Sequence, residues 1–258
     1  MSPTDGSACA VELHGFAKSY RLGWLGGRIQ AVQALTLRLE AGQVLGLLGP
    51  NGSGKSTTLK ALAGLIAPTA GECRVFGHRA GSDAARPLVG YLAESPHFSP
   101  HLSGAAFLRY CGELSGLAST TLQERVTEVL AWGGLATVGA RPIGTYSKGM
   151  VQRLGLAQAI IHDPTLILLD EPASGLDPEG RLALHRLIRE LAGKGKTIVF
   201  SSHLLASAGA VCDRLAILGH GRLLLEGPAG ELMGDAHPLI PTPSRLEQLY
   251  LERLHAYG

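Results

Sequence analysis

The stretch Gly49-Pro50-Asn51-Gly52-Ser53-Gly54-Lys55-Ser56 decides the fold, because it follows the pattern of a phosphate-binding loop. That pattern is Gly, any four residues, and then Gly-Lys-Ser or Gly-Lys-Thr. The apolar run 44–48 in front of it predicts a buried parallel strand, and residues 57–62 behind it predict the opening of a helix. Since backbone N–H groups and a helix N-terminus both attract phosphate oxygens, the sequence predicts a nucleoside triphosphate site here.

Each kind of residue in this loop has an expected role. Gly49, Gly52 and Gly54 let the backbone turn its N–H groups inward, where a side chain would collide with phosphate. Lys55 is expected to reach the β- and γ-phosphates and to assist catalysis, and the Ser56 hydroxyl is expected to be a ligand of Mg²⁺. The full set of expected nucleotide contacts in this region is Gly49, Pro50, Asn51, Gly52, Ser53, Gly54, Lys55, Ser56 and Thr57.

Composition favours a cytoplasmic globular chain. Its 258 residues can form one large domain or two small ones. The formal net charge is +2, from 23 basic and 21 acidic residues without a basic block, which argues against nucleic acid as a partner. The four cysteines form no Cys-x-x-Cys pair, which favours unpaired thiols in a reducing cytosol over metal binding. No apolar run has membrane-spanning length, and residues 1–10 lack the pattern of a signal peptide.

Strand and helix patterns alternate along most of the chain. Strands are predicted at 11–16, 35–40, 44–48, 72–76, 89–92, 165–170, 197–200, 214–218 and 222–226. Helices are predicted at 55–66, 102–114, 122–130, from 147 onward, at 178–191 and 204–211, and near the C-terminus. The Gly-rich residues 21–29 predict a loop with Trp24 at its middle. This order predicts an α/β fold with a mostly parallel sheet, helices on both faces, and a helical insertion at about 99–159.

A second site element is Leu168-Leu169-Asp170-Glu171-Pro172, an apolar strand that ends in two acids. In open α/β sheets, ligands bind at the carboxyl ends of the strands, so these carboxylates are expected to face the phosphate loop. Asp170 is expected to hold Mg²⁺ through its coordination shell. Glu171 is expected to orient and deprotonate the water that attacks the γ-phosphate.

A third element is Tyr146-Ser147-Lys148-Gly149-Met150-Val151-Gln152-Arg153, which opens a helix. Ser147 suits an N-cap, and Gly149 permits close approach of the backbone to another group. With the two preceding elements, the whole chain resembles the nucleotide-binding subunit of an ABC transporter. The family signature there is Leu-Ser-Gly-Gly-Gln; Ser147 and Gly149 match it, whereas Lys148 and Met150 depart from it. Such departures resemble exporter-type cassettes, which favours export over import.

The resemblance implies roles for four more residues. Tyr20 matches the aromatic side chain that stacks on adenine. Asp177, in Ser174-Gly175-Leu176-Asp177, belongs to the loop that crosses to the partner subunit. His203 matches the switch histidine that contacts the γ-phosphate, and is therefore an expected catalytic residue. Glu94 stands where the family usually has Gln; it keeps an oxygen ligand for Mg²⁺ but adds a negative charge and removes a hydrogen-bond donor.

The resemblance also implies the assembly. ATP would lie between the phosphate loop of one subunit and residues Ser147, Lys148 and Gly149 of a second, in a homodimer or a heterodimer with another cassette. The fold would be a RecA-like P-loop core with an antiparallel β subdomain and an inserted α-helical subdomain. Transmembrane permease subunits would dock near residues 95–101, so the chain would be peripheral on the inner face of the cell membrane. Nothing in the sequence identifies the transported substrate.

The expected domain boundaries are a flexible N-terminus at 1–10, an ATPase domain at 11–234, and a linker with a C-terminal amphipathic helix at 235–258. His220 and His237 have no ligand spacing, and no metal is assigned to them. Two other classes of protein fit this sequence less well. A soluble ABC ATPase of DNA repair or translation control resembles longer chains with coiled-coil insertions or two cassettes, and a kinase or GTPase has no use for residues 147–153.

Overall fold

The structure is a computed structural model that describes residues 9–21, 23, 26–203 and 211–233. Several sequence predictions lie outside these residues: the N-terminus up to residue 8, the position of Trp24, most of the helix at 204–211, the linker and helix of 235–258, and His237. Within the described residues, no helix combines the length and apolar character needed to cross a membrane.

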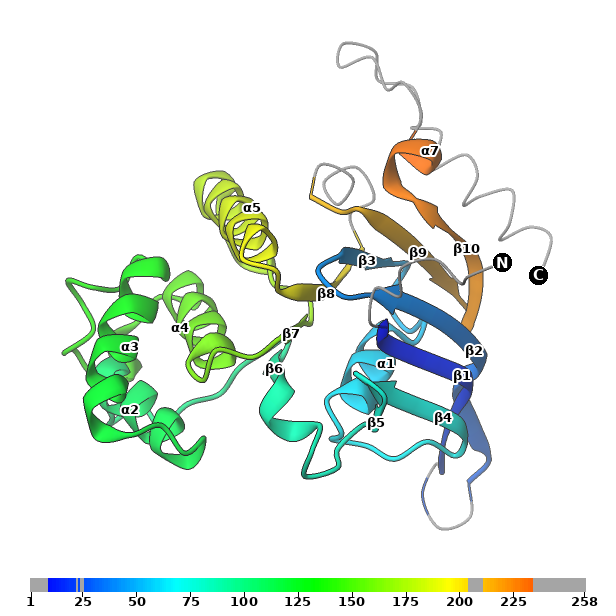
Figure 1. The fold of residues 1–258 in the computed structure, drawn as a ribbon, viewed down its shortest axis with the longest axis horizontal. Coiled ribbons are helices and arrows are strands. Elements are labelled where there is room, and N and C mark those ends of the chain that lie inside the picture. The colour runs from blue at the N-terminus through cyan, green and yellow to red at the C-terminus, as the bar shows by residue number, and fades with distance from the viewer. Residues whose placement is uncertain (1–8, 22, 24–25, 204–210, 234–258) are drawn as a thin grey trace, which may run out of the picture.

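A six-stranded sheet forms the centre of the molecule (Figure 1). Its order is β10 (Arg222–Pro228), β9 (Arg214–Gly219), β3 (Val44–Leu48), β8 (Thr197–Ser202), β7 (Leu166–Leu169) and β6 (Val89–Leu92). All neighbours are parallel except β9 and β10, which form the predicted hairpin. Every residue of β3 and β7 is buried, which explains why these strands read as continuous apolar runs.

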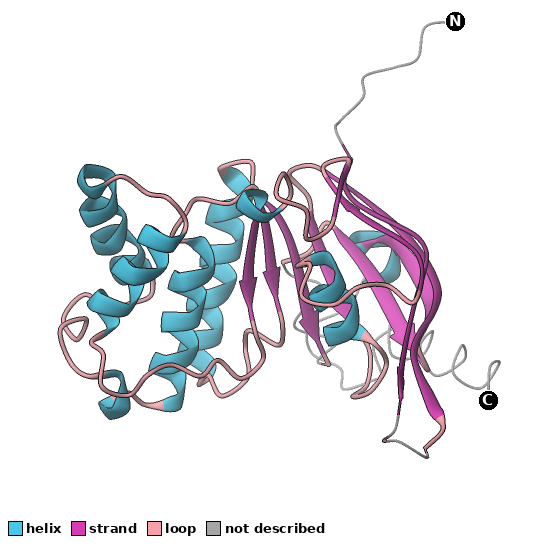
Figure 2. Cartoon of the chain, turned by 90° about the horizontal axis from the view of Figure 1, so that it is seen from below, coloured by secondary structure: helices cyan, strands magenta, loops and turns pink. Residues whose placement is uncertain are grey.

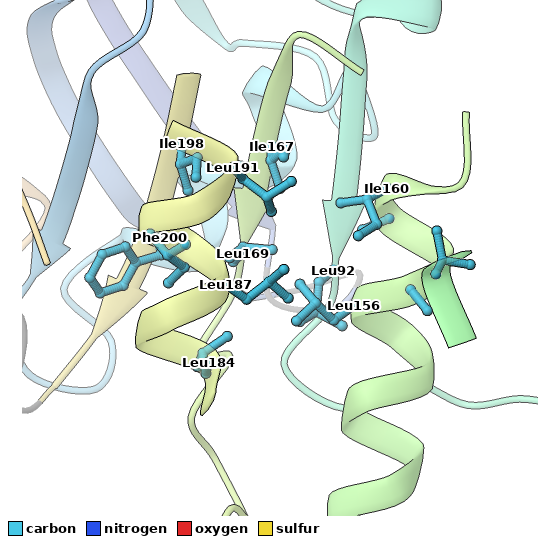
Figure 3. Packing of buried hydrophobic residues seen from close by; sticks show 14 of the residues in the cluster. Leu92, Leu156, Ile160, Ile167, Leu169, Leu184, Leu187, Leu191, Ile198 and Phe200 are labelled. Atoms are coloured by element: carbon cyan, nitrogen blue, oxygen red, sulfur yellow. The ribbon is translucent and has the colours of Figure 1, made fainter. Parts of the chain in front are cut away.

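Helices cover one face of this sheet. The large apolar cluster on this face joins the sheet to α2 (Gly104–Leu114), α3 (Ser119–Trp132), α4 (Lys148–Ile160) and α5 (Pro178–Gly193). Figure 3 shows Leu184, Leu187 and Leu191 of α5 packed over strands β7 and β8. The predicted apolar face of α3 is confirmed, because Leu122, Val126, Val129 and Leu130 are all buried.

The other face packs against α1 (Lys55–Leu62) and a second sheet. That sheet is antiparallel, in the order β2 (Arg28–Glu40), β1 (Cys9–Arg21), β4 (Ala70–Val75) and β5 (His78–Arg79). Side chains of β3 point to both faces of the central sheet. Val44 and Leu48 pack in the helical cluster, whereas Leu45 and Leu47 pack in the cluster under the antiparallel sheet. Both faces therefore carry helices, and on the second face α1 is accompanied by the antiparallel β subdomain that the resemblance implied (Figure 2).

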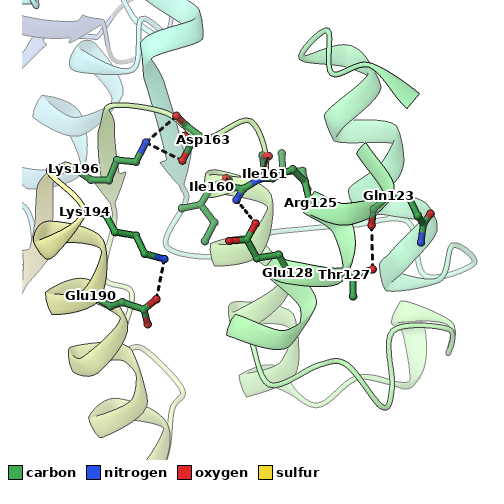
Figure 4. A network of polar contacts seen from close by, with 10 residues as sticks. All are labelled: Gln123, Arg125, Thr127, Glu128, Ile160, Ile161, Asp163, Glu190, Lys194 and Lys196. Carbon is green, nitrogen blue, oxygen red and sulfur yellow. Dashed lines mark hydrogen bonds and ion pairs between the residues drawn. The ribbon is translucent and has the colours of Figure 1, made fainter. Parts of the chain in front are cut away.

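The helical insertion lies at one end of the molecule (Figures 1 and 2) and comprises α2, α3 and α4. Arg125 links α3 to the end of α4. The Arg125 guanidinium donates hydrogen bonds to the carbonyl oxygens of Ile160 at 2.7 Å and Ile161 at 3.1 Å (Figure 4). Lys194, after α5, lies 4.2 Å from the ring centroid of Trp132, at the end of α3. Shorter elements complete the described chain: η1 (Arg86–Leu88), η2 (Ile143–Thr145) and α7 (Ala229–Met233).

Two predicted strands are too short and one predicted helix is too long. Strand β1 already begins at Cys9, and β2 begins at Arg28 inside the predicted loop, because the two strands pair as a long ribbon up to Arg21 and Arg28. Helix α1 ends at Leu62 rather than at residue 66. Gly64, with φ of +72°, stops it: the Gly64 N–H donates to Ala61 O and the Leu65 N–H to Lys60 O, a Schellman motif.

Candidate functional site

The loop 49–54 connects β3 to α1 at the carboxyl end of the parallel sheet, as predicted. Gly49 has φ of +145°, and a Cβ atom there would lie 2.2 Å from the Leu218 carbonyl oxygen, so only glycine fits. Gly52 has φ of +79°, and no described atom lies within 4 Å of the place where its Cβ would stand. The loop is therefore packed on the sheet side and open on the other.

Lys55 points back into this loop. Its side chain is 5% exposed, and Nζ donates hydrogen bonds to Gly49 O at 2.7 Å and Pro50 O at 3.1 Å. Nζ also lies 3.7 Å from Oε1 of Glu171. The loop thus holds a buried ammonium group at its centre, in contact with the predicted general base.

The N-terminus of α1 offers hydrogen-bond donors to an anion. No described side chain caps it, and its first turn holds no acidic residue, so its first N–H groups have no partner within the helix. The Ser53 hydroxyl is buried and likewise has no hydrogen-bond partner among the residues that the structure describes. Unpaired donors around a buried lysine fit the phosphates of a nucleotide.

Asp170 lies directly after β7 and is 1% exposed. Its Oδ1 accepts hydrogen bonds from the hydroxyls of Ser56 at 2.9 Å and Ser201 at 2.8 Å. The Asp170 N–H donates to Leu92 O at 2.9 Å, which continues the β6–β7 pairing. The carboxylate and the Ser56 hydroxyl are hard oxygen donors, the type of ligand that Mg²⁺ prefers, so this pair fits the predicted magnesium site.

Glu171 has φ of +46°, an uncommon conformation for a residue other than glycine. This turn is fixed by its N–H, which donates to Ser201 Oγ at 2.7 Å. Its Oε2 lies 2.9 Å from Nδ1 of His203, and Oε1 is buried without a hydrogen-bond partner in the described part of the chain. Glu171 therefore has one oxygen oriented by His203 and one that faces the Lys55 ammonium without a hydrogen bond, an arrangement suited to a general base.

Two predicted residues make no hydrogen bond to the site in the described structure. Glu94 follows β6 and is exposed. Tyr20 lies at the outer end of β1, is 40% exposed, and has Nζ of Lys18 at 5.3 Å from its ring centroid. Both side chains are exposed on the surface, where a ligand could contact them. Their predicted roles remain predictions.

The predicted signature residues lie at a second location, away from the phosphate loop. Ser147 caps α4, as predicted, because its Oγ accepts from the Met150 N–H at 3.3 Å. Asp177 caps α5, with Oδ1 accepting from the Gly180 N–H at 2.8 Å. Ser147, Lys148, Gly149 and Asp177 line one groove of about 660 Å³ between α3, α4 and α5. Figure 1 shows α4 and α1 on opposite sides of β6 and β7, so one chain does not bring this groove to its own phosphate loop.

Sequence reasoning missed two residues at the site. Ser201, fully buried on β8, joins Asp170 to the backbone of Glu171. Tyr91, on β6, has a buried hydroxyl close to Asp170. The signal that could have found Ser201 is the one used for Asp170: a polar residue at the carboxyl end of a buried parallel strand.

A strand, a glycine loop and a helix, with Lys55, Ser56, Asp170 and Glu171 converging at the same sheet edge, define a P-loop nucleoside triphosphatase. Comparison with known proteins identifies the family. The family described as "ABC transporter" matches residues 32–174.

Individual relatives agree with this match. An uncharacterised ABC transporter ATP-binding protein of Nostoc sp. is 40% identical over 90% of this chain and 70% of its own length. The daunorubicin/doxorubicin resistance ATP-binding protein DrrA of Streptomyces peucetius is 39% identical over 86% of this chain and 66% of its own length. A solved structure titled as the ATP-binding subunit of an ABC transporter superposes with a TM-score of 0.80 at 29% identity, covering 95% of this chain and 99% of that one.

The chain belongs to the ABC transporter family, as an ATP-binding, ATP-hydrolysing cassette. The predicted fold class is confirmed by the structural match, and the soluble DNA-repair or translation-factor alternative is not supported.

Proposed function

We propose that this chain binds Mg²⁺-ATP in the site around Lys55 and hydrolyses it to drive transport through separate membrane subunits. The observation that carries the proposal is the convergence of Lys55 and His203 on the two oxygens of Glu171, at 3.7 Å and 2.9 Å. This convergence supports the proposal, because hydrolysis of ATP needs a base, a cation and a second proton-handling group next to the phosphate loop.

Each residue of this site has a proposed task. Lys55 would exchange its two carbonyl contacts for phosphate oxygens, together with the N–H groups of residues 49–57. Ser56 and Asp170 would hold the magnesium ion, with Glu94 at its rim; bound there, the ion would neutralise charge on the phosphates. Glu171 would take the proton of the attacking water, and His203 would orient Glu171 and contact the γ-phosphate. Tyr20 would stack on the adenine base.

The groove at α4 supports the proposal of a second binding surface, which would contact the nucleotide held by another chain. Lys148 is the first residue of α4, whose first turn holds no acid, so helix dipole and side chain both favour an anion there. A Cβ atom on Gly149 would meet Leu176 at 3.6 Å, an ordinary contact, so packing within the chain does not demand glycine. We infer that the nucleotide of a partner cassette approaches Ser147 and Gly149, with Asp177 near the crossing between subunits. A homodimer is the simplest such assembly.

The membrane partner and the direction of transport are inferred from relatives. Two relatives are named for drug resistance and for Nod factor export, which favours export. Permease subunits would dock near residues 95–101, beside Glu94, so that docking and the metal site are neighbours along the chain. The chain would then lie peripherally on the inner face of the cell membrane.

Purification of the tagged chain from native membranes tests this function. We expect integral membrane subunits to co-purify, and Mg²⁺-dependent ATPase activity to accompany them. The same preparation with Lys55→Ala should retain the membrane subunits and lose the activity, which separates assembly from catalysis. A chain recovered only from the cytosol, without membrane subunits, would contradict a role in transport.

A further inference from the structure

Tyr91 is a half-buried residue at the site, with a buried hydroxyl, and it has no part in the proposed hydrolysis. It lies on edge strand β6, opposite Leu168 of β7 in the parallel register. Both side chains belong to the cluster on the α1 face of the sheet. Asp170 is two residues beyond Leu168, and two strand residues span about 6.6 Å, so a tyrosine side chain that leans along the strand reaches the carboxylate.

The Tyr91 hydroxyl is a donor without an established acceptor. Its oxygen is buried and makes no hydrogen bond of acceptable geometry with any described residue. The pKa of the phenol is raised by burial first, then by the negative charges of Asp170 and Glu94, and last by its closeness to the Asp170 carboxylate as a hydrogen-bond partner, although the angles do not make a formed hydrogen bond. A phenol is protonated at neutral pH, so Tyr91 presents an O–H donor toward these carboxylates.

A buried unpaired donor destabilises the protein unless another state of the site gives it a partner. In this structure Asp170 uses one oxygen, Oδ1, for both serine hydroxyls. Divalent cations are bound most tightly where the ligating carboxylate is itself hydrogen-bonded by neighbouring groups. Tyr91 is placed to be such a neighbour.

We propose that Tyr91 is a positioning residue for the divalent cation: its hydroxyl donates to the Asp170 carboxylate when the cation binds, and so lets Asp170 and Glu94 serve one ion. This inference rests on the proposed Mg²⁺-ATP function. It assigns Tyr91 no contact with the nucleotide, and it predicts an effect on metal affinity that a purely structural residue would not show.

The test compares Tyr91→Phe with Tyr110→Phe, both made in the Glu171→Gln variant so that ATP is not consumed. Tyr110 is 54% exposed on α2 and loses the same single oxygen atom far from the site. Mn²⁺, which is visible by electron paramagnetic resonance, is titrated in the presence of ATP. We expect Tyr91→Phe to weaken Mn²⁺ binding about 10-fold. Binding of a fluorescent ATP analogue in EDTA should be unchanged, and Tyr110→Phe should have no effect on either measurement.

Thermal unfolding without metal gives an independent readout. Tyr91→Phe removes an unpaired donor and should leave Tm unchanged or raise it. Tyr146→Phe should lower Tm, because the Tyr146 hydroxyl donates to Val138 O at 2.9 Å. Adding Glu94→Gln should reduce the effect of Tyr91→Phe on Mn²⁺ affinity, since one of the two carboxylates is then neutral.

The outcomes separate this inference from the function on which it rests. Equal Mn²⁺ affinity for Tyr91→Phe and Tyr110→Phe would overturn the inference and leave the proposed function standing. Loss of metal-free nucleotide binding by Tyr91→Phe would also overturn it, because the residue would then act on the fold. If the Glu171→Gln parent itself binds no Mn²⁺ with ATP, the proposed metal site fails and the inference fails with it.

Discussion

Ser201 donates a hydrogen bond from its Oγ to Oδ1 of Asp170 over 2.8 Å. The same Oγ accepts the N–H of Glu171 at 2.7 Å. One fully buried hydroxyl on β8 therefore fixes both acids that follow β7, the proposed metal ligand and the proposed base. Ser201 thus links β8 to the residues that follow β7, at the place where ATP hydrolysis is proposed to occur.

Ser201→Ala should lower ATP hydrolysis by about 10- to 100-fold, because outer hydrogen-bond partners set ligand orientation. It should also lower the free energy of unfolding by about 1–3 kcal/mol, since the buried N–H of Glu171 loses its acceptor. Steady-state ATPase assays and urea denaturation measure the two effects. Ser115→Ala, which removes an exposed hydroxyl, is the control. Equal activity of the two variants would show that Ser201 does not position the acids.

The sequence predicts the main contacts of this site because they are carried by short local patterns. Lys55 follows a glycine loop, and Asp170 follows an apolar strand, so both are expected at the same edge of a parallel sheet. Ser201 and Tyr91 act across strands, and their importance depends on the order β8-β7-β6. No pattern in the sequence specifies that strand order, so the contacts of Ser201 and Tyr91 with the site are seen only in the folded structure.

The wrong boundaries have a similar origin. The β1–β2 ribbon continues to Arg21 and Arg28, where most of the side chains on both strands are partly or fully exposed. Without a buried face there is no alternation to detect, so the residues read as a loop. In α1 the apolar pattern continues to Ile66, but the positive φ of Gly64 ends the helix earlier.

Lys55→Ala should abolish ATP hydrolysis and weaken ATP binding, because it removes the charge that faces the phosphates. The cost in stability should be about 2–4 kcal/mol, because two hydrogen bonds to loop carbonyls and the ion pair with Glu171 are lost. Isothermal titration calorimetry with ATP and thermal unfolding measure these quantities. Lys60→Ala, on the exposed side of α1, should behave as wild type. Normal hydrolysis by Lys55→Ala would contradict the assignment of the site.

Glu94→Gln should be tolerated, because it keeps an oxygen ligand and reduces the repulsion from Asp170. Glu94→Ala should slow hydrolysis or uncouple it from transport. ATPase rates measured across a range of Mg²⁺ concentrations distinguish these cases. Glu113→Gln removes a comparable exposed charge on α2 and serves as the control. If Glu94→Gln is as inactive as Glu171→Gln, Glu94 has a catalytic role beyond metal binding.

Three thiols should make stability depend on pH in alkaline solution. Burial raises the pKa of Cys73 and Cys212 to about 12 and that of Cys111 to about 11, from 9.0. Because the folded-state pKa values are higher, stabilisation is complete below about pH 9 and is lost as pH rises toward 11–12. Urea denaturation at increasing pH measures this. Replacing Cys73, Cys111 and Cys212 by alanine together should flatten the profile, and an unchanged profile would contradict it.

Glu171→Gln separates catalysis from assembly. It keeps the size of the side chain but removes the general base, which should slow hydrolysis by about 10²–10⁴-fold. It also removes a negative charge next to the γ-phosphate, which eases repulsion where two chains close over ATP. The variant should therefore bind ATP and accumulate as a dimer. Size-exclusion chromatography with light scattering, in the presence of Mg²⁺-ATP, detects that dimer directly.

Ser147→Arg in the same background tests where the nucleotide is held. Ser147 lies in the groove at α4, away from the phosphate loop of its own chain, and its hydroxyl oxygen caps the helix. A large side chain there would occupy the space proposed for the partner's γ-phosphate, so the double variant should bind ATP and remain monomeric. Ser115→Ala in place of Ser147→Arg should leave the dimer intact. A Glu171→Gln protein that stays monomeric with ATP at high concentration would contradict a homodimer and indicate a different cassette as its partner.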